Sequence, residues 1–184
     1  MNVVYVTGNP GKARYFSKII GLDIEHHDAD VDEVQSLNLE EIAVHKAKQA
    51  FTYLKRPVIV EDTSLSLKSM APLPGPFIKW FEIALGLDGF CRLADISPDR
   101  SAIVSNIHVY YDGRKTHLFK SSLEGTIADK PRGKGGFGFN PTFIPVGKSQ
   151  TMAEMPDEEF IKEYLKFKPI LQLKEFLLSL DNKN

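Results

Sequence analysis

Residues 3–12 read VVYVTGNPGK, and this stretch decides the fold class. The run Val3–Val6 is β-branched and aromatic without alternation, which predicts a short strand buried on both faces. Apolar residues at helical spacing follow between Gly11 and Ile20, and Gly21 is a typical helix stop. A strand, a glycine-bearing turn and a helix in this order are typical of an open α/β sheet, which binds ligands at the carboxyl ends of its strands.

The rest of the chain continues this pattern. The dipeptide Asp112-Gly113 lies between two long β segments and predicts a hairpin, whereas Pro169 should divide a long carboxy-terminal helical stretch into two helices. We therefore expect one α/β domain with a mixed sheet. The expected elements are strands at 22–26, 58–60, 101–111 and 116–127, and helices at 38–55, 77–85 and 157–180.

Composition excludes several classes of protein. The 184 residues include 23 Lys+Arg and 24 Asp+Glu, so the net charge of −1 is too balanced for a nucleic-acid or membrane-surface binder. An apolar share of 42% argues against disorder, and a single cysteine excludes a disulfide scaffold or a multi-cysteine zinc site. Charges or prolines interrupt every long apolar window, so we expect a soluble cytoplasmic protein that binds neither nucleic acid nor membrane.

The turn Thr7–Lys12 is a candidate phosphate site. Glycines let backbone N–H groups approach an oxyanion, the start of the following helix favours negative charge, and Lys12 adds a full cation. The spacing of a Walker A loop is absent, because Ala13 follows the lysine. An ordinary strand-to-helix turn would have the same sequence, and this alternative stays open.

The pair Glu61-Asp62, at the end of an apolar strand, is a candidate metal site. Adjacent side chains in a strand point in different directions, so one acid can bind a metal while the scaffold holds the other. Carboxylate oxygens suit Mg²⁺, which usually arrives with phosphates. A solvated strand end is the alternative. The acidic run at 28–33 is rejected as a calcium loop, because Glu33 occupies the position that needs glycine, although one of its members could still bind a metal.

The loop Gly133–Asn140 combines four glycines with two phenylalanines. This composition suggests close backbone approach to a planar group, with an aromatic ring available for stacking. A mobile hairpin loop is the alternative, but Phe137 and Phe139 would be unusual residues to leave in one. Cys91, by contrast, is expected to be a packed helix residue and not a nucleophile.

Seven short motifs occur in one order over nearly the whole chain, and together they make the sequence similar to the inosine triphosphate pyrophosphatase family. Members of this family remove non-standard purine nucleoside triphosphates from the nucleotide pool. The motifs are TGNPGK at 7–12, EVQ at 33–35, KA at 46–47, VEDTSL at 60–65, PGPFIKWF at 74–81, GFGFNPTF at 136–143 and TMAEMP at 151–156.

The resemblance implies a single elongated α/β domain over 1–184, in which helices flank a long mixed central sheet and form two lobes with a cleft between them. It implies a homodimer that uses Mg²⁺ to hydrolyse a nucleoside triphosphate to the monophosphate and pyrophosphate. Asp62 and Lys12 would be catalytic, and Glu33 and Asp62 would hold the metal. The residues that would bind substrate are Thr7, Gly8, Asn9, Pro10, Gly11, Lys12, Lys46, Thr63, Lys79, Phe137, Gly138, Phe139 and Asn140, with Phe139 stacking on the base.

The sequence departs from the family mainly where the base is read. Phe160 stands in place of a lysine, and Tyr164-Leu165-Lys166 in place of a Ser-His-Arg tripeptide. Asn140 replaces an aspartate and Tyr15 replaces a glutamate. We therefore expect a changed or relaxed base preference. The sequence leaves open whether a nearby lysine, Lys162, Lys166 or Lys168, replaces the missing contacts to the base.

Two other functions were weighed against this one. A degenerate relative that binds nucleotides with little or no turnover would also have lost contacts to the base. A plain nucleic-acid-binding module is disfavoured, because the chain has no basic stripe.

Overall fold

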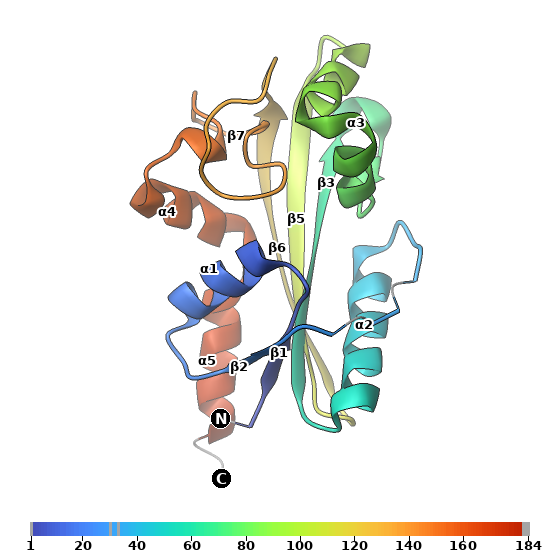
Figure 1. Ribbon diagram of the computed structural model, residues 1–184, viewed down its shortest axis with the longest axis vertical. Helices are drawn as coiled ribbons and strands as arrows, with labels where there is room; N and C mark the ends of the chain where they lie inside the picture. Colours follow the sequence, from blue (N-terminus) through green and yellow to red (C-terminus); the bar gives the residue numbers. More distant parts are fainter. Residues whose placement is uncertain (1, 30, 33, 182–184) are drawn as a thin grey trace. The chain divides into compact units, whose positions relative to one another are not determined.

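A computed structural model describes residues 2–29, 31–32 and 34–181 (Figure 1). Seven strands form a mixed sheet in the order β2-β1-β3-β5-β6-β7, with β4 paired to β3, and helices flank the sheet. The strands are β1 (Val4–Val6), β2 (Glu25–His27), β3 (Val58–Leu67), β4 (Pro74–Gly75), β5 (Ser101–Tyr111), β6 (Thr116–Ile127) and β7 (Phe143–Pro145). The α-helices are α1 (Pro10–Ile20), α2 (Leu39–Leu54), α3 (Ile78–Leu93), α4 (Asp157–Phe167) and α5 (Ile170–Asp181).

The sheet confirms the expected mixed α/β class. Strand β1 pairs in parallel with both β2 and β3, whereas β4 and β7 pair antiparallel with their neighbours. The turn between β5 and β6 is stabilised by Asp112, whose Oδ1 accepts from the backbone N–H groups of Arg114 at 2.8 Å and Lys115 at 2.7 Å. Gly113 has φ of +91°, and a Cβ there would lie 2.3 Å from the ring of Phe51, so glycine is required at this turn.

The residues form two compact units, and three strands, β3, β5 and β6, contribute to both. Unit 1 comprises the described residues within 1–62, 106–120 and 168–184. Its sheet has a helical layer on each face: α2 covers one face, and α1 and α5 cover the other (Figure 1). Val4 and Val6 of β1 pack in the cluster beneath α2, whereas Tyr5 between them stacks on Phe16 of α1 with ring centroids 3.8 Å apart. Burial on both faces explains the unbroken apolar run of this strand.

Unit 2 comprises residues 63–105 and 121–167. Helix α3 consists of two helical segments that meet at Gly86, whose φ of +65° and ψ of 173° are not helical, so the helix expected over 77–85 does end at this break and a second helical segment follows it. Phe90 and Cys91 lie fully buried in its second half, which confirms the packing role expected for the cysteine. None of the helices in the described part of the chain is long and apolar enough to span a bilayer.

One expected boundary is confirmed by the structure and another differs from it. Pro169 separates α4 from α5, as expected. Strand β3, however, extends seven residues beyond the expected end at Val60 and includes Glu61, Asp62 and Thr63. The polar triplet therefore lies within a strand and does not terminate it.

Candidate active site

The turn after β1 is built by its own polar side chains. Asn9 caps α1, since its Oδ1 accepts the backbone N–H of Lys12 at 3.1 Å, and its own N–H donates to Thr7 Oγ1 at 3.2 Å. Pro10 occupies the first helical position, where its fixed φ and missing N–H are favourable. The turn thus places the Lys12 side chain in the first turn of α1, where the helix dipole attracts anions.

A buried carboxylate, Glu61 on β3, holds this lysine. Lys12 Nζ lies 3.1 Å and Lys168 Nζ 2.8 Å from Glu61 Oε1, and His108 Nε2 lies 3.0 Å from Glu61 Oε2. Three of these side chains, Glu61, Lys168 and His108, are each at most 1% exposed. The Lys12 side chain is 15% exposed. Glu61 is therefore the acid that the scaffold holds, which the sequence had predicted for one of the two neighbours.

The charges in this cluster follow from its burial. Burial alone would raise the pKa of Glu61, but the ammonium groups of Lys168 and Lys12 together with His108 outweigh it and hold the pKa well below its usual value. Burial lowers the pKa of Lys168 to about 8 against the opposing attraction of Glu61, and it lowers the pKa of His108 as well. Around neutral pH the cluster therefore pairs one carboxylate with two ammonium groups and a neutral imidazole.

Asp62 faces a different set of neighbours from Glu61. Its Oδ2 lies 3.6 Å from Nζ of Lys46 on α2, and its backbone carbonyl accepts from Asn106 Nδ2 on β5 at 2.8 Å. Its side chain is 17% exposed, far more than that of Glu61. Three lysines and two acids thus lie near one another beside the carboxyl end of β1 and the middle of β3, an arrangement suited to a polyanion.

The carboxylate of Asp62 has the donor chemistry that Mg²⁺ prefers, and Mg²⁺ commonly takes only one or two protein carboxylates and completes its shell with phosphates and water. The second expected ligand, Glu33, lies outside the described residues. Within the described ranges no three His, Cys, Asp or Glu side chains converge on a point. Asp62 together with substrate oxygens fits this cation.

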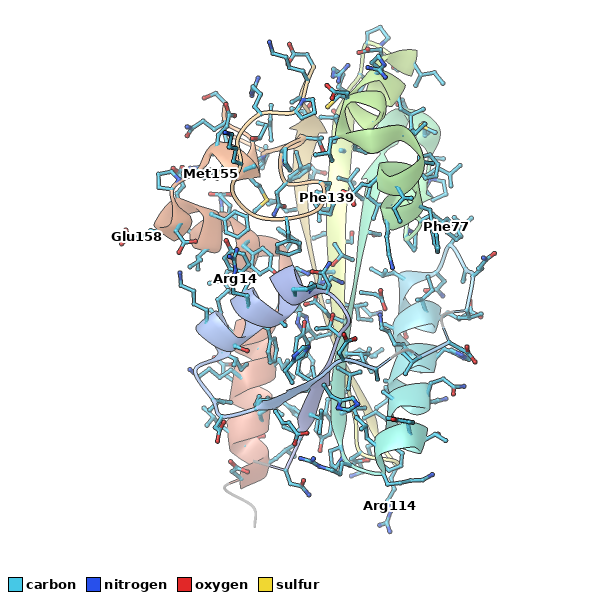
Figure 2. All side chains as sticks on the ribbon, viewed as in Figure 1. Arg14, Phe77, Arg114, Phe139, Met155 and Glu158 are labelled. Carbon is cyan, nitrogen blue, oxygen red and sulfur yellow. The ribbon has the colours of Figure 1, made fainter. Side chains whose placement is uncertain are left out.

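Unit 2 carries the glycine-rich loop, on which Phe139 is labelled in Figure 2. Asn140 is 2% exposed, its N–H donates to the carbonyl of Phe137 at 3.2 Å, and its carbonyl accepts from Ala153. Gly136 has φ of +69°, and a Cβ on it would lie 2.3 Å from Asn140 Nδ2. The loop is thus a tight turn closed over a buried amide, and not a mobile hairpin.

The residues that depart from the family motif form an aromatic cluster in unit 2. The rings of Phe160 and Tyr164 stack with centroids 5.4 Å apart, and Tyr164 also meets Phe167 and, at 6.2 Å, Phe137 of the glycine-rich loop. Lys166 pairs with the buried Glu163 at 2.7 Å.

Each remaining expected site residue has a definite place. In unit 2, Thr63 lies partly buried on β3, and Lys79 lies exposed in the first turn of α3 with Nζ 5.7 Å from the ring centroid of Trp80. Lys168, one candidate for the base reader, is instead buried on Glu61 in unit 1. The structure therefore brings Lys12, Lys46 and Asp62 together in unit 1 and assembles residues 137–140 in unit 2.

The sequence did not predict the places of three buried polar residues: His108 and Glu82 were not expected at all, and Lys168 was considered only as a reader of the base. His108 and Lys168 are separated from Glu61 by 47 and 107 residues, and no local pattern points to such pairs. Glu82 lies in the second turn of α3 with a buried Oε1, and burial raises the pKa of its carboxyl to about 7. An acid among the apolar residues around Phe81 was the one available signal.

A mixed α/β sheet that places lysines and adjacent acids beside the turn between a strand and the start of a helix is typical of phosphate-binding α/β proteins. Residues 3–176 match the Ham1 family, and the chain belongs to this family. It is 39% identical to an inosine triphosphate pyrophosphatase of Yarrowia lipolytica, with 96% of each chain covered, and 37% identical to that of Schizosaccharomyces pombe, with 98% of this chain and 97% of the relative covered. A dITP/XTP pyrophosphatase of Methanopyrus kandleri is 36% identical, with 88% of each chain covered.

Solved structures confirm the fold. A HAM1 protein from Coxiella burnetii superposes with a TM-score of 0.83 at 22% identity, covering 97% of this chain and all of the other. The Ham1 protein of Staphylococcus aureus gives a TM-score of 0.76 at 24% identity, with 96% and 98% covered. Both agree with the seven-stranded mixed sheet flanked by helices.

Proposed function

We propose that this protein hydrolyses non-standard purine nucleoside triphosphates, such as those of hypoxanthine and xanthine, to the monophosphate and pyrophosphate. The relatives that cover nearly the whole chain carry the names of such pyrophosphatases. The observation that carries the proposal is that two adjacent acids have different surroundings. Glu61 is buried and pairs with Lys12, whereas the side chain of Asp62 is partly accessible to solvent.

In this proposal the residues of unit 1 do the phosphate chemistry. Lys12 and Lys46 bind phosphate oxygens and stabilise the charge that develops on the leaving pyrophosphate. Asp62 orients the attacking water and accepts its proton, a role open to a carboxylate that is reachable from solvent. The turn Thr7–Gly11 contacts phosphate through its backbone and the start of α1.

Mg²⁺ would be held by Asp62 and Glu33 together with substrate oxygens. When bound, it supplies Lewis-acid stabilisation of the phosphates. No covalent nucleophile is needed, which agrees with the burial of Cys91, whose pKa burial raises to about 11.

The proposal also assigns substrate contacts to residues of unit 2. Thr63 and Lys79 bind substrate, and residues 137–140 bind the base, with Phe139 as the stacking ring.

We also propose that the protein is a cytoplasmic homodimer, as the family resemblance implies. Light scattering coupled to size exclusion tests the oligomeric state directly.

The experiment is an assay that separates the two phosphate products. Inosine triphosphate is incubated with the protein in Mg²⁺, and pyrophosphate and orthophosphate are measured separately, together with the nucleotide product. We expect monophosphate and pyrophosphate. Release of the diphosphate and orthophosphate would contradict the proposal, and so would the absence of turnover with every triphosphate tried.

Variants assign the residue roles in the same assay. Asp62→Asn keeps the shape of the side chain but is a far weaker base, and we expect kcat to fall by about 10²-fold or more. Asp23→Asn, an exposed acid of unit 1, is the matched control and should retain wild-type activity. Equal activity of the two variants would remove Asp62 from the mechanism.

A further inference from the structure

Helix α3 holds a carboxyl group whose burial the fold does not explain. Oε1 of Glu82 is buried, and no other described residue donates a hydrogen bond to it. Burial raises the pKa of this carboxyl, and no cation among the described residues offsets that rise. A buried acid of this kind is costly to keep, because an unsatisfied polar group loses its hydration without replacement. Such groups gather at binding sites, where a ligand supplies the missing partner.

Glu82 lies against the glycine-rich loop of the same unit. Its two carboxyl oxygens are 3.6 and 3.7 Å from the position that a Cβ on Gly138 would occupy. Because Gly138 has φ of +56° and no side chain, the loop backbone approaches the carboxyl group with nothing inserted between them.

The same loop contains a second unsatisfied polar atom. Nδ2 of Asn140 is buried and makes no hydrogen bond to any described residue. Gly136 is packed so closely against this amide that the side chain has little room to turn away. The loop therefore contains a buried donor, Nδ2 of Asn140. A buried acceptor, Oε1 of Glu82 on α3, lies beside Gly138, two residues before Asn140.

We propose that Glu82 and Asn140 together select the base, with Glu82 accepting a ring N–H and Asn140 donating from Nδ2 to the adjacent carbonyl. This proposal rests on the proposed function, in which residues 137–140 bind the base. A 6-oxopurine presents the complementary pair, a donor at N1 beside an acceptor at O6. Adenine presents the reverse pair, an acceptor at N1 beside a donor at N6, and is disfavoured.

The aromatic cluster of unit 2 explains why base reading would depend on α3. The positions that carry hydrogen-bonding groups in the family motif are occupied here by Phe160 and Tyr164, which are buried against each other. Lys166 is engaged with Glu163. Among the described residues of unit 2, Glu82 and Asn140 therefore supply buried donor and acceptor atoms directly at the loop.

The test measures selectivity, which a merely structural role would not change. The kcat/KM ratio for inosine triphosphate over adenosine triphosphate is determined for wild type, Glu82→Leu and Glu82→Gln. A well-placed pair of hydrogen bonds discriminates by roughly tenfold to a hundredfold, so we expect the ratio to fall at least about tenfold in Glu82→Leu. Glu82→Gln keeps an acceptor oxygen and should retain an intermediate ratio. Asp88→Leu, which changes an exposed acid on the same helix, should leave the ratio unchanged.

A binding measurement separates this proposal from the proposed function. Inosine and adenosine monophosphates are titrated against the fluorescence of Trp80, the single tryptophan, which lies two residues before Glu82 on α3. Preference for inosine monophosphate that is lost in Glu82→Leu supports the role of Glu82, even if no triphosphate is hydrolysed. An unchanged preference in a folded variant, or no binding of either monophosphate, would overturn it. If Glu82→Leu does not fold, the same comparison with Glu82→Gln decides.

Discussion

The stability of the protein should depend on pH through Glu82, whatever the substrate. Burial raises the pKa of this carboxyl from 4.5 to about 7 in the folded state. The folded protein holds the proton of Glu82 more tightly than the unfolded chain does. Glu82 therefore does not lower the free energy of unfolding below about pH 4.5. The cost grows as the pH rises through 7 and is constant above that range, so stability is lost towards alkaline pH.

The size of this effect follows from the two pKa values. A difference of about 2.5 pH units corresponds to about 3 kcal/mol at alkaline pH. Water reaches part of the side chain and screens its charge, so we expect about 2 kcal/mol. Glu82→Gln removes the ionisation, and we therefore expect it to be about 2 kcal/mol more stable than wild type at about pH 8.5 and close to equal to it near pH 4.

Urea denaturation at the two pH values, followed by circular dichroism, measures this difference directly. Glu175→Gln changes an exposed glutamate of α5 and controls for the general loss of a negative charge. A stability difference between Glu82→Gln and wild type that is the same at both pH values would refute the reasoning, because a pH-independent effect cannot come from ionisation.

Three further predictions follow from other parts of the molecule. Lys168→Met leaves Glu61 buried with fewer cations and should cost about 3–5 kcal/mol in urea denaturation, and adding Glu61→Gln should restore part of that loss. Gly136→Ala and Gly147→Ala both place a side chain at positive φ, but only the first also collides with Asn140, so Gly136→Ala should lower the melting temperature several degrees further. Chelation by EDTA should stop pyrophosphate release, and Mg²⁺ should restore it without any change in the circular dichroism spectrum.

The elements that could be predicted are those with local causes. The apolar run of β1, the Asp112-Gly113 turn and the break at Pro169 each depend on residues a few positions apart, and the structure contains all three. The family motifs also lie in short stretches, so the family could be inferred before any fold was known.

The end of β3 could not be predicted, because its cause is distant in sequence. Glu61 resembles the polar residue that normally ends a buried strand. It remains inside the sheet because Lys12 and Lys168, on either side of it in the chain, neutralise its charge. Similarly, helical spacing places Glu82 on α3 but does not reveal that its oxygen is buried against the glycine-rich loop.

The partners of Glu61 also have a consequence for synthesis of the chain. Lys12 emerges from the ribosome early, His108 later and Lys168 near the end, yet all three surround one buried carboxylate. A nascent chain that has not yet exposed residue 168 cannot complete this cluster and must leave Glu61 partly hydrated. Strand β3 therefore reaches its final burial only after translation has passed α4, so unit 1 cannot finish folding before residue 168 has been made.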